Sequence, residues 1–245
     1  MFRWMAALAM LALVAACDDV VITQAPAPAP VPANPSGIVP IDVPDDLRTR
    51  DKAARAFVEV VGRMEPVAER ECRVRTSGVN CDFRILVDDR PGQPANAFQT
   101  LDENERPILV FTLALLDEAR NKDEIAFVMG HEAAHHVLGH IARQRTNAAV
   151  GADLFAGIAS ITGADSSAIE SAQRIGAQVG ARTFSKEFEL EADALGTVIT
   201  ARSGYDPIAG SQFFNRIPDP GDRFLGTHPP NARRIETVRR TAAGL

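Results

Sequence analysis

The stretch His131-Glu132-Ala133-Ala134-His135 constrains this chain most, because it lies in an apolar run whose spacing predicts a helix. Residues four apart share a helix face, so His131 and His135 can bind one zinc ion. Glu132 points about 100° around the helix and can reach a water on the metal rather than the metal itself. This layout is typical of a zinc peptidase whose general base is Glu132.

The alternative is that these histidines are ordinary core or surface residues. Clustering argues against it, because four of the five histidines lie between His131 and His140. The other two in this stretch, His136 and His140, lie on a rotated face, and we expect them to be exposed or to support the metal ligands from behind. The motif helix is predicted to begin after an N-cap at Asp123 and to end within residues 143–146.

Length and composition indicate an ordinary globular protein. The chain has 245 residues, of which 46% are hydrophobic, and this allows one large domain or two small ones with a sizeable core. A formal net charge of -6 and only 6% aromatic residues disfavour nucleic acid as a partner, since such a partner requires a basic surface and stacking rings.

The N-terminal residues are predicted to lie outside the fold. Residues 1–16 have the pattern of a secretory signal peptide, and Val14-Ala15-Ala16-Cys17 resembles the bacterial lipobox, in which the cysteine is lipidated and becomes the first mature residue. An ordinary signal peptide is the alternative; an uncleaved membrane helix is disfavoured because the apolar run is shorter than about 20 residues. Residues 17–44 include a Pro-rich segment and are predicted to be an extended tether from the membrane.

The remaining cysteines support an exported location. If Cys17 is lipidated, Cys72 and Cys81 form an even pair in an oxidising compartment, and we expect a disulfide between them. Two free buried thiols, as in a cytosolic protein, are the alternative.

The folded domain is predicted to span residues 45–245. A helix is expected over 45–71, a strand over 81–87, a second strand over 107–112 and a short helix over 113–121. The second strand is a candidate edge strand beside the zinc, where a substrate backbone could add to the sheet. A core strand with no exposed edge is the alternative, and local sequence does not separate the two.

Two helical stretches follow the motif. Residues 147–164 are rich in Ala and Gly, and they could form a lid, a membrane-contacting segment or a packed helix. Residues 166–200 are predicted to form one long or broken helix, which Gly176 and Gly180 should weaken in its middle.

A catalytic zinc usually takes three protein ligands and leaves one position for water. The class with the motif H-E-x-x-H-x-x-G-x-x-H does not fit, because Leu138 and Ile141 stand where that motif has Gly and His. A carboxylate from a later helix is the remaining source of the third ligand, and residues 187–193 supply several.

Here the chain resembles the M48 family of zinc metallopeptidases, whose third ligand is the Glu of an E-x-x-A-D pattern, matched by residues 189–193. The resemblance implies that Glu189 is the third ligand, with Glu191 as the reserve candidate. Asp193 lies four residues from Glu189 on the same face and can accept the free N–H of a ligand histidine.

Further segments carry the same resemblance, over roughly residues 45–239. They are Asn96-Ala97-Phe98, Gly204-Tyr205-Asp206-Pro207, Thr227-His228-Pro229-Pro230 and Arg234-Ile235. One departure is Lys186, where the family commonly has Arg. The resemblance implies a mainly helical α+β fold of the zincin type, with the motif on the active-site helix, a small β-sheet with an edge strand, and one zinc ion per chain.

Three more polar residues are candidates near the zinc. His228 could donate a hydrogen bond to the developing oxyanion or occupy the open zinc position in a resting state, and Tyr205 is a rival donor. Arg234 could pair with a carboxylate behind the ligands or cap a helix.

The function expected from these features is zinc-dependent endopeptidase activity in the bacterial cell envelope, on the periplasmic side of the inner or outer membrane. Family and compartment imply misfolded or misassembled envelope proteins as substrates. Two alternatives remain, namely a chaperone or assembly scaffold with latent protease activity and a zinc hydrolase of cell-wall amides.

Overall fold

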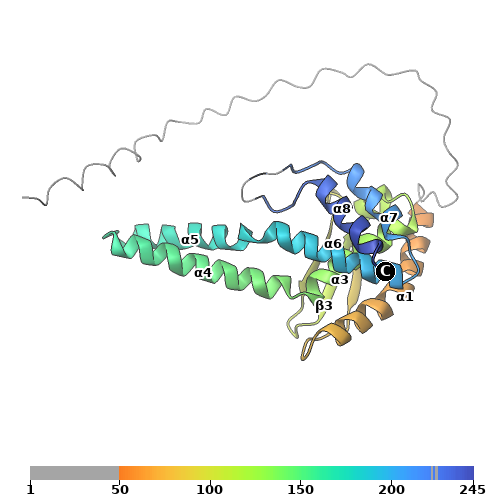
Figure 1. The fold of residues 1–245 in the computed structure, drawn as a ribbon, viewed down its shortest axis with the longest axis horizontal. Helices are drawn as coiled ribbons and strands as arrows, with labels where there is room; N and C mark the ends of the chain where they lie inside the picture. Colours follow the sequence, from red (N-terminus) through yellow and green to blue (C-terminus); the bar gives the residue numbers. More distant parts are fainter. Residues whose placement is uncertain (1–49, 222, 224–225) are drawn as a thin grey trace, which may run out of the picture. The chain divides into compact units, whose positions relative to one another are not determined.

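The computed structural model describes residues 50–221, 223 and 226–245, which belong to one compact unit (Figure 1). The predicted signal peptide, Cys17, the tether and residues 45–49 lie outside these described residues. The first half of the unit contains α1 (Arg50–Arg75), β1 (Arg84–Asp88), β2 (Ala97–Leu101), β3 (Pro107–Thr112), α2 (Leu113–Glu118) and α3 (Lys122–Val137). The second half contains α4 (His140–Ile161), α5 (Ser166–Thr183), α6 (Ser185–Arg202), α7 (Pro207–Gly210), the 3-10 helix η1 (Ser211–Asn215) and α8 (Asn231–Ala242).

The strands form a small mixed sheet in the order β1-β3-β2. β3 pairs in parallel with β1 and antiparallel with β2, so Leu109 lies opposite Ile85 on one side and Gln99 on the other. The mainly helical α+β fold with a small sheet is therefore confirmed. Of the two alternatives for residues 107–112, the candidate edge strand is wrong and the core strand is correct, because β3 is central and β2 is the edge strand near the motif helix. The continuous apolar run of β3 suits a strand with neighbours on both sides.

The main core lies between the sheet, α1 and α3. Phe57 of α1 meets Phe111 of β3 edge to face at 5.2 Å between ring centroids. Buried apolar residues of α3, such as Ala126 and Met129, complete this core. A disulfide joins Cys72, near the end of α1, to Cys81, just before β1. These contacts fix the sheet beside the helix that carries the histidine motif.

α3 differs from its prediction at both ends. Its N-cap is Asn121, whose side chain accepts a hydrogen bond from Glu124 N at 2.9 Å, whereas Asp123 lies in the first turn. The helix stops at Val137 because Gly139 adopts the left-handed conformation, with φ of 64°. The chain then turns and begins α4 at His140, so the expected continuation to residues 143–146 is wrong.

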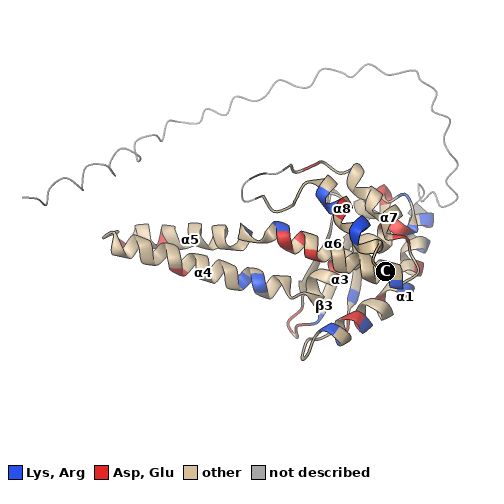
Figure 2. Cartoon of the chain, viewed as in Figure 1, with Lys and Arg blue, Asp and Glu red and all other residues tan. Residues whose placement is uncertain are grey.

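α4 and α5 form an antiparallel hairpin that extends from the rest of the unit (Figure 1). α5 is continuous through Gly176 and Gly180, which let its backbone approach α4 at Gly151 and Asn147. Residues 147–161 belong to α4 and pack along α5, as the packed-helix alternative expects. Figure 2 shows few charged residues along this hairpin. Nowhere in the described part of the chain is a helix both long and apolar enough to cross a membrane.

Candidate metal centre

The site forms where α3 and α6 cross at very short range. A Cβ atom on Gly130 of α3 would lie 2.8 Å from the carbonyl oxygen of Gly196, and one on Gly196 would lie 2.8 Å from the His131 backbone nitrogen. Such distances are too short for any side chain, so only glycine allows this approach. The close crossing brings Glu189, one turn from the start of α6, beside the histidines of α3.

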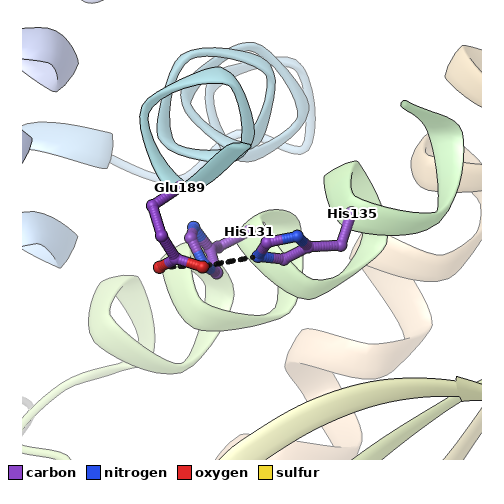
Figure 3. Close-up of side chains that lie close together, drawn as sticks. All are labelled: His131, His135 and Glu189. Atoms are coloured by element: carbon purple, nitrogen blue, oxygen red, sulfur yellow. Dashed lines mark hydrogen bonds and ion pairs between the residues drawn. The ribbon is translucent and has the colours of Figure 1, made fainter. Parts of the chain in front are cut away.

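Figure 3 shows Glu189 reaching from α6 to both motif histidines. His131 Nε2 lies 3.0 Å from His135 Nε2, and the Glu189 carboxylate oxygens lie 3.6 Å from the first and 3.3 Å from the second. Their donor atoms all lie within 4.8 Å of one another. Two imidazole nitrogens and one carboxylate oxygen are a donor set that catalytic zinc takes, with a fourth position left for water. The residues present therefore fit a zinc ion.

His131 is supported by a buried carboxylate. Its Nδ1 lies 2.9 Å from Asp193 Oδ1, and Asp193 is fully buried. Arg234 holds the same carboxylate in a bidentate pair, because Nε donates to Oδ2 and Nη2 donates to Oδ1, both at 2.7 Å. The guanidinium also lies 4.0 Å over the ring of Phe214. Arg234 thus pairs with the carboxylate behind a candidate ligand, one of the two alternatives that the sequence leaves open.

His135 is supported differently. Its Nδ1 lies 2.8 Å from Nδ1 of His140, whose Nε2 lies 3.1 Å from Glu191 Oε2. Arg143 pairs with Glu191 from the outside. The ring of His140 is buried and stacks on Phe188, with 4.7 Å between ring centroids. Glu191 therefore faces His140 and Arg143, and it is not among the described residues that form the metal group.

The electrostatics of the centre favour a cation. Burial and the nearby Arg234 act to lower the pKa of His131, but Asp193 and Glu189 outweigh them and raise it to about 10. Burial acts to raise the pKa of Glu189, yet contacts with His131 and His135 hold it well below its usual range. Both shifts mean that the cluster stabilises positive charge at its centre, as a metal site must.

Neither of the other two motif histidines is exposed. Burial lowers the pKa of His136, whose Nε2 lies 2.7 Å from the carbonyl oxygen of Asn80, so this residue ties α3 to the segment before β1. Burial and the neighbouring His135 lower the pKa of His140 to about 4. His140 contacts the candidate ligand His135 on the side away from the metal group, so the expectation of a supporting role is correct for it. His136 lies on another face of α3, where its hydrogen bond goes to Asn80 rather than to a candidate ligand.

A cavity of about 670 Å³ opens beside the metal group and is lined by residues of β2, α3, α6 and the segment before α8. Glu132 and His228 both line it. The His228 side chain is 54% exposed, and its Nε2 lies 3.9 Å from Glu189 Oε2. Tyr205 is buried and is absent from the described residues that line the cavity, so the structure does not bring this rival donor to the site.

Two features of the site are missing from the sequence-based prediction. The strand β2 has an unremarkable sequence, Ala-Phe-Gln-Thr-Leu, and gives little local signal. The contact between His135 and His140 depends on the helix ending at Val137. The pair Leu138-Gly139 is itself a stop signal, because glycine is common just past a helix end, and that signal could have placed His140 in a new helix.

Comparisons with known proteins agree on one relationship. The sequence model of peptidase family M48 matches residues 63–242. The beta-barrel assembly-enhancing protease of Escherichia coli (strain K12) is 30% identical over 169 residues, which cover 60% of this chain and 32% of that protein. A putative beta-barrel assembly-enhancing protease of Vibrio cholerae is 34% identical over 140 residues, 51% of this chain and 28% of that protein. The mitochondrial metalloendopeptidase OMA1 of Arabidopsis thaliana is 30% identical over 135 residues, 54% and 27% respectively. The matches span less than a third of these relatives' lengths.

Proposed function

This chain belongs to peptidase family M48, and from that premise we propose that it is a zinc-dependent metalloendopeptidase. The observation that carries the proposal is the group of His131, His135 and Glu189 in an open cavity, with Glu132 beside it. The two helices that bear these residues cross through glycines, so the donor atoms are held together by backbone packing rather than by flexible loops.

In this proposal, His131, His135 and Glu189 hold the zinc ion. Bound there, zinc would polarise a substrate carbonyl and bring the pKa of a water from about 15.7 towards 7. Glu132 follows His131 on α3 and lines the cavity, so it is placed to accept the proton of the attacking water and return it to the leaving amine. Asp193 and Arg234 keep the His131 ring in place from the buried side.

His228 enters the cavity from the segment before α8. We assign it a role on the reacting carbonyl, as a hydrogen-bond donor to the oxyanion. Replacing His228 with Ala should lower kcat by about 100-fold if it donates to the oxyanion. A rise in kcat would instead assign it the blocking role that the sequence leaves as the alternative.

The sheet edge suggests how a substrate is held. β2 pairs with β3 on one side, and residues 97–99 of β2 line the cavity, with Phe98 39% exposed. A peptide that adds to this edge would bind through its backbone and would need no particular side chain. Unfolded segments of proteins, which offer free backbone groups, are therefore the proposed substrates.

We place this activity in the bacterial envelope, on misfolded or misassembled proteins. The lipobox-like segment ending at Cys17 and the Pro-rich tether support a lipid-anchored protein on the periplasmic side of a membrane. The names of the bacterial relatives, beta-barrel assembly-enhancing proteases, support the same setting. Fractionation of inner and outer membranes, compared with a Cys17→Ala variant, tests the anchor; a variant that stays in the membrane fraction would contradict it.

The activity is tested by cleavage of casein or another unfolded protein. Glu132→Gln should reduce kcat by about 100-fold or more while zinc content stays the same, because it removes the proton acceptor and keeps the ligands. The matched control is Glu187→Gln, an exposed residue of α6, which should leave kcat unchanged. Equal cleavage by the wild type and Glu132→Gln would overturn the mechanism, whereas no cleavage by the zinc-loaded wild type would favour a scaffold function.

The third ligand is tested by zinc content after loading with excess zinc. Glu189→Ala should lose most of its zinc, because one of three donors is gone, whereas Glu191→Ala should still load fully. The opposite result would transfer the ligand role to Glu191.

A further inference from the structure

We propose that His140 is a positioning residue for the metal centre: it accepts a hydrogen bond from His135 Nδ1 and so fixes the tautomer and ring orientation in which His135 Nε2 faces the metal. This inference rests on the proposed zinc site at His131, His135 and Glu189. It concerns a residue outside the metal group, and the contacts on the outer side of His135 support it.

The direction of these hydrogen bonds follows from chemistry. A neutral histidine that offers the lone pair of Nε2 to a metal carries its proton on Nδ1. His135 Nδ1 must then donate, and the atom it meets at 2.8 Å is Nδ1 of His140, which must accept. His140 in turn carries its proton on Nε2, and it donates this proton to Glu191 Oε2 at 3.1 Å. An ionised carboxylate only accepts, so the direction of the whole chain is fixed.

Packing holds His140 in the place that this chain requires. Its ring is 4% exposed and stacks on Phe188 with only 10° between the planes. Its backbone is set by the left-handed turn at Gly139, which starts α4 directly behind the motif helix. Arg143, one turn further along α4, fixes the carboxylate of Glu191. The His140 ring is thus held at both nitrogens and on one face, and it can fix the orientation of the His135 ring.

His136 provides a contrast on the same helix. It is also buried, and its Nε2 also has a hydrogen-bond partner, but that partner is the carbonyl oxygen of Asn80, and its ring packs against Phe83. Loss of His136 therefore removes a buried histidine and a hydrogen bond without touching the metal group. A substitution at His136 is therefore the matched control, because it should lower stability without changing zinc binding.

The test separates hydrogen bonding from packing by two substitutions. His140→Asn keeps an acceptor oxygen at the position of Nδ1 but loses the ring, whereas His140→Phe keeps a ring that can stack on Phe188 but has no acceptor. Zinc affinity is measured for the full chain by competition with a chromophoric chelator. The absorption spectrum of the cobalt-substituted protein reports the ligand geometry independently of activity.

We expect His140→Phe to lower zinc affinity by about 10- to 100-fold and to alter the cobalt spectrum, as the loss of a partner behind a metal ligand typically does. His140→Asn should retain affinity within a few-fold, and His136→Asn should lower the melting temperature with no change in affinity. Wild-type affinity in His140→Phe, or equal losses in the Phe and Asn variants, would overturn the inference.

If His140→Phe does not fold, Glu191→Ala decides, because Glu191 is partly exposed and its loss leaves His140 Nε2 without its acceptor. A weakened zinc affinity with full loading at excess zinc supports the chain of contacts, and an unchanged affinity and cobalt spectrum overturn it. Failure of the wild type to bind zinc at all would instead sink the proposed function, and the positioning role with it, so the two failures are distinguishable.

Discussion

His131 and His135 present the same nitrogen, Nε2, towards Glu189, but their other nitrogens meet different surroundings. His131 meets Asp193, a fully buried carboxylate that Arg234 neutralises from inside the fold. His135 meets the uncharged ring of His140, and the charge that ends this second chain lies on the half-exposed Glu191. The support of His131 is a buried ion pair, and the support of His135 is a chain of hydrogen bonds that leads to the surface. We therefore expect substitutions in the two supports to lower stability by different amounts and with a different dependence on salt and pH.

The largest effect is expected at Asp193. Asp193→Asn leaves the buried Arg234 with Glu189, 3.4 Å from its Nη2, as its remaining carboxylate partner, and breaking one half of a buried pair costs about 3–5 kcal/mol. Urea unfolding of the metal-free protein measures this loss. The exposed Asp153→Asn on α4 is the control and should stay within about 0.5 kcal/mol of the wild type. A loss below about 1 kcal/mol at Asp193 would mean that the buried support is not stronger than the exposed one.

A pH titration of the metal-free protein should separate the two supports. Burial and Arg234 oppose protonation of His131, but Asp193 and Glu189 raise its pKa to about 10, above the unfolded value of about 6.5. The stability from this proton is present below pH 6.5 and is lost as the pH rises towards 10. Burial and His135 lower the pKa of His140 to about 4, so its contribution is present above pH 6.5 and is lost as the pH falls to 4.

Melting temperatures of the metal-free protein between about pH 4 and 10 measure these slopes. The wild type should lose stability above pH 7, and His131→Gln should lack that loss. Saturating zinc should remove the alkaline slope, because the metal takes the place of the proton on His131. A metal-free protein whose stability rises from pH 7 to 10 would contradict the raised pKa of His131.

A smaller effect is expected from the helix crossing that serves both histidines. Gly196→Ala puts a Cβ atom against the His131 backbone and should cost about 1–3 kcal/mol through overpacking. Zinc affinity should fall too, because Glu189 moves with α6. Gly157→Ala is the matched control, since nothing lies near its Cβ position, and it should stabilise α4 by up to about 1 kcal/mol. Equal effects of the two substitutions on zinc affinity would show that the close crossing does not position the ligands.

The smallest effect is expected at the Arg143–Glu191 ion pair, where the hydrogen-bond chain behind His135 reaches the surface. Arg143→Gln removes an ion pair in which both side chains are more than 40% exposed, and such pairs contribute about 0–1 kcal/mol. The change in unfolding free energy should shrink further in high salt, because exposed charges are screened. A loss as large as that of Asp193→Asn, unaffected by salt, would erase the difference between the two supports.

Local sequence is sufficient for the parts of this site that one helix contains. The spacing of His131, Glu132 and His135 fixes their relative directions on α3, because helix geometry is regular. Glu189 and Asp193 lie four residues apart and share one face of α6 for the same reason. The two helices come together at Gly130 and Gly196. No local sequence pattern predicts that these two glycines contact each other.

Long-range pairing also explains the error in the sheet. The apolar run of residues 107–112 predicts a strand correctly, but its place in the sheet depends on which other segments pair with it. Residues 97–101 are not apolar enough to be recognised by themselves, and they become the edge strand only because β3 pairs with them. In the same way, His140 becomes the partner of His135 only through the turn at Gly139.

The length of the turn at Leu138-Gly139 sets the position of α4 relative to the motif on α3. One residue inserted between Leu138 and His140 would change the tight turn that sets the start of α4 and should carry the His140 ring away from His135. The same insertion in the turn at residues 162–165, at the far end of α4, would leave that spacing untouched. The length of the hairpin can therefore change at the turn between α4 and α5 without moving His140, whereas the turn at Gly139 must keep its length. A tag or graft is better placed at residues 162–165 than at Gly139.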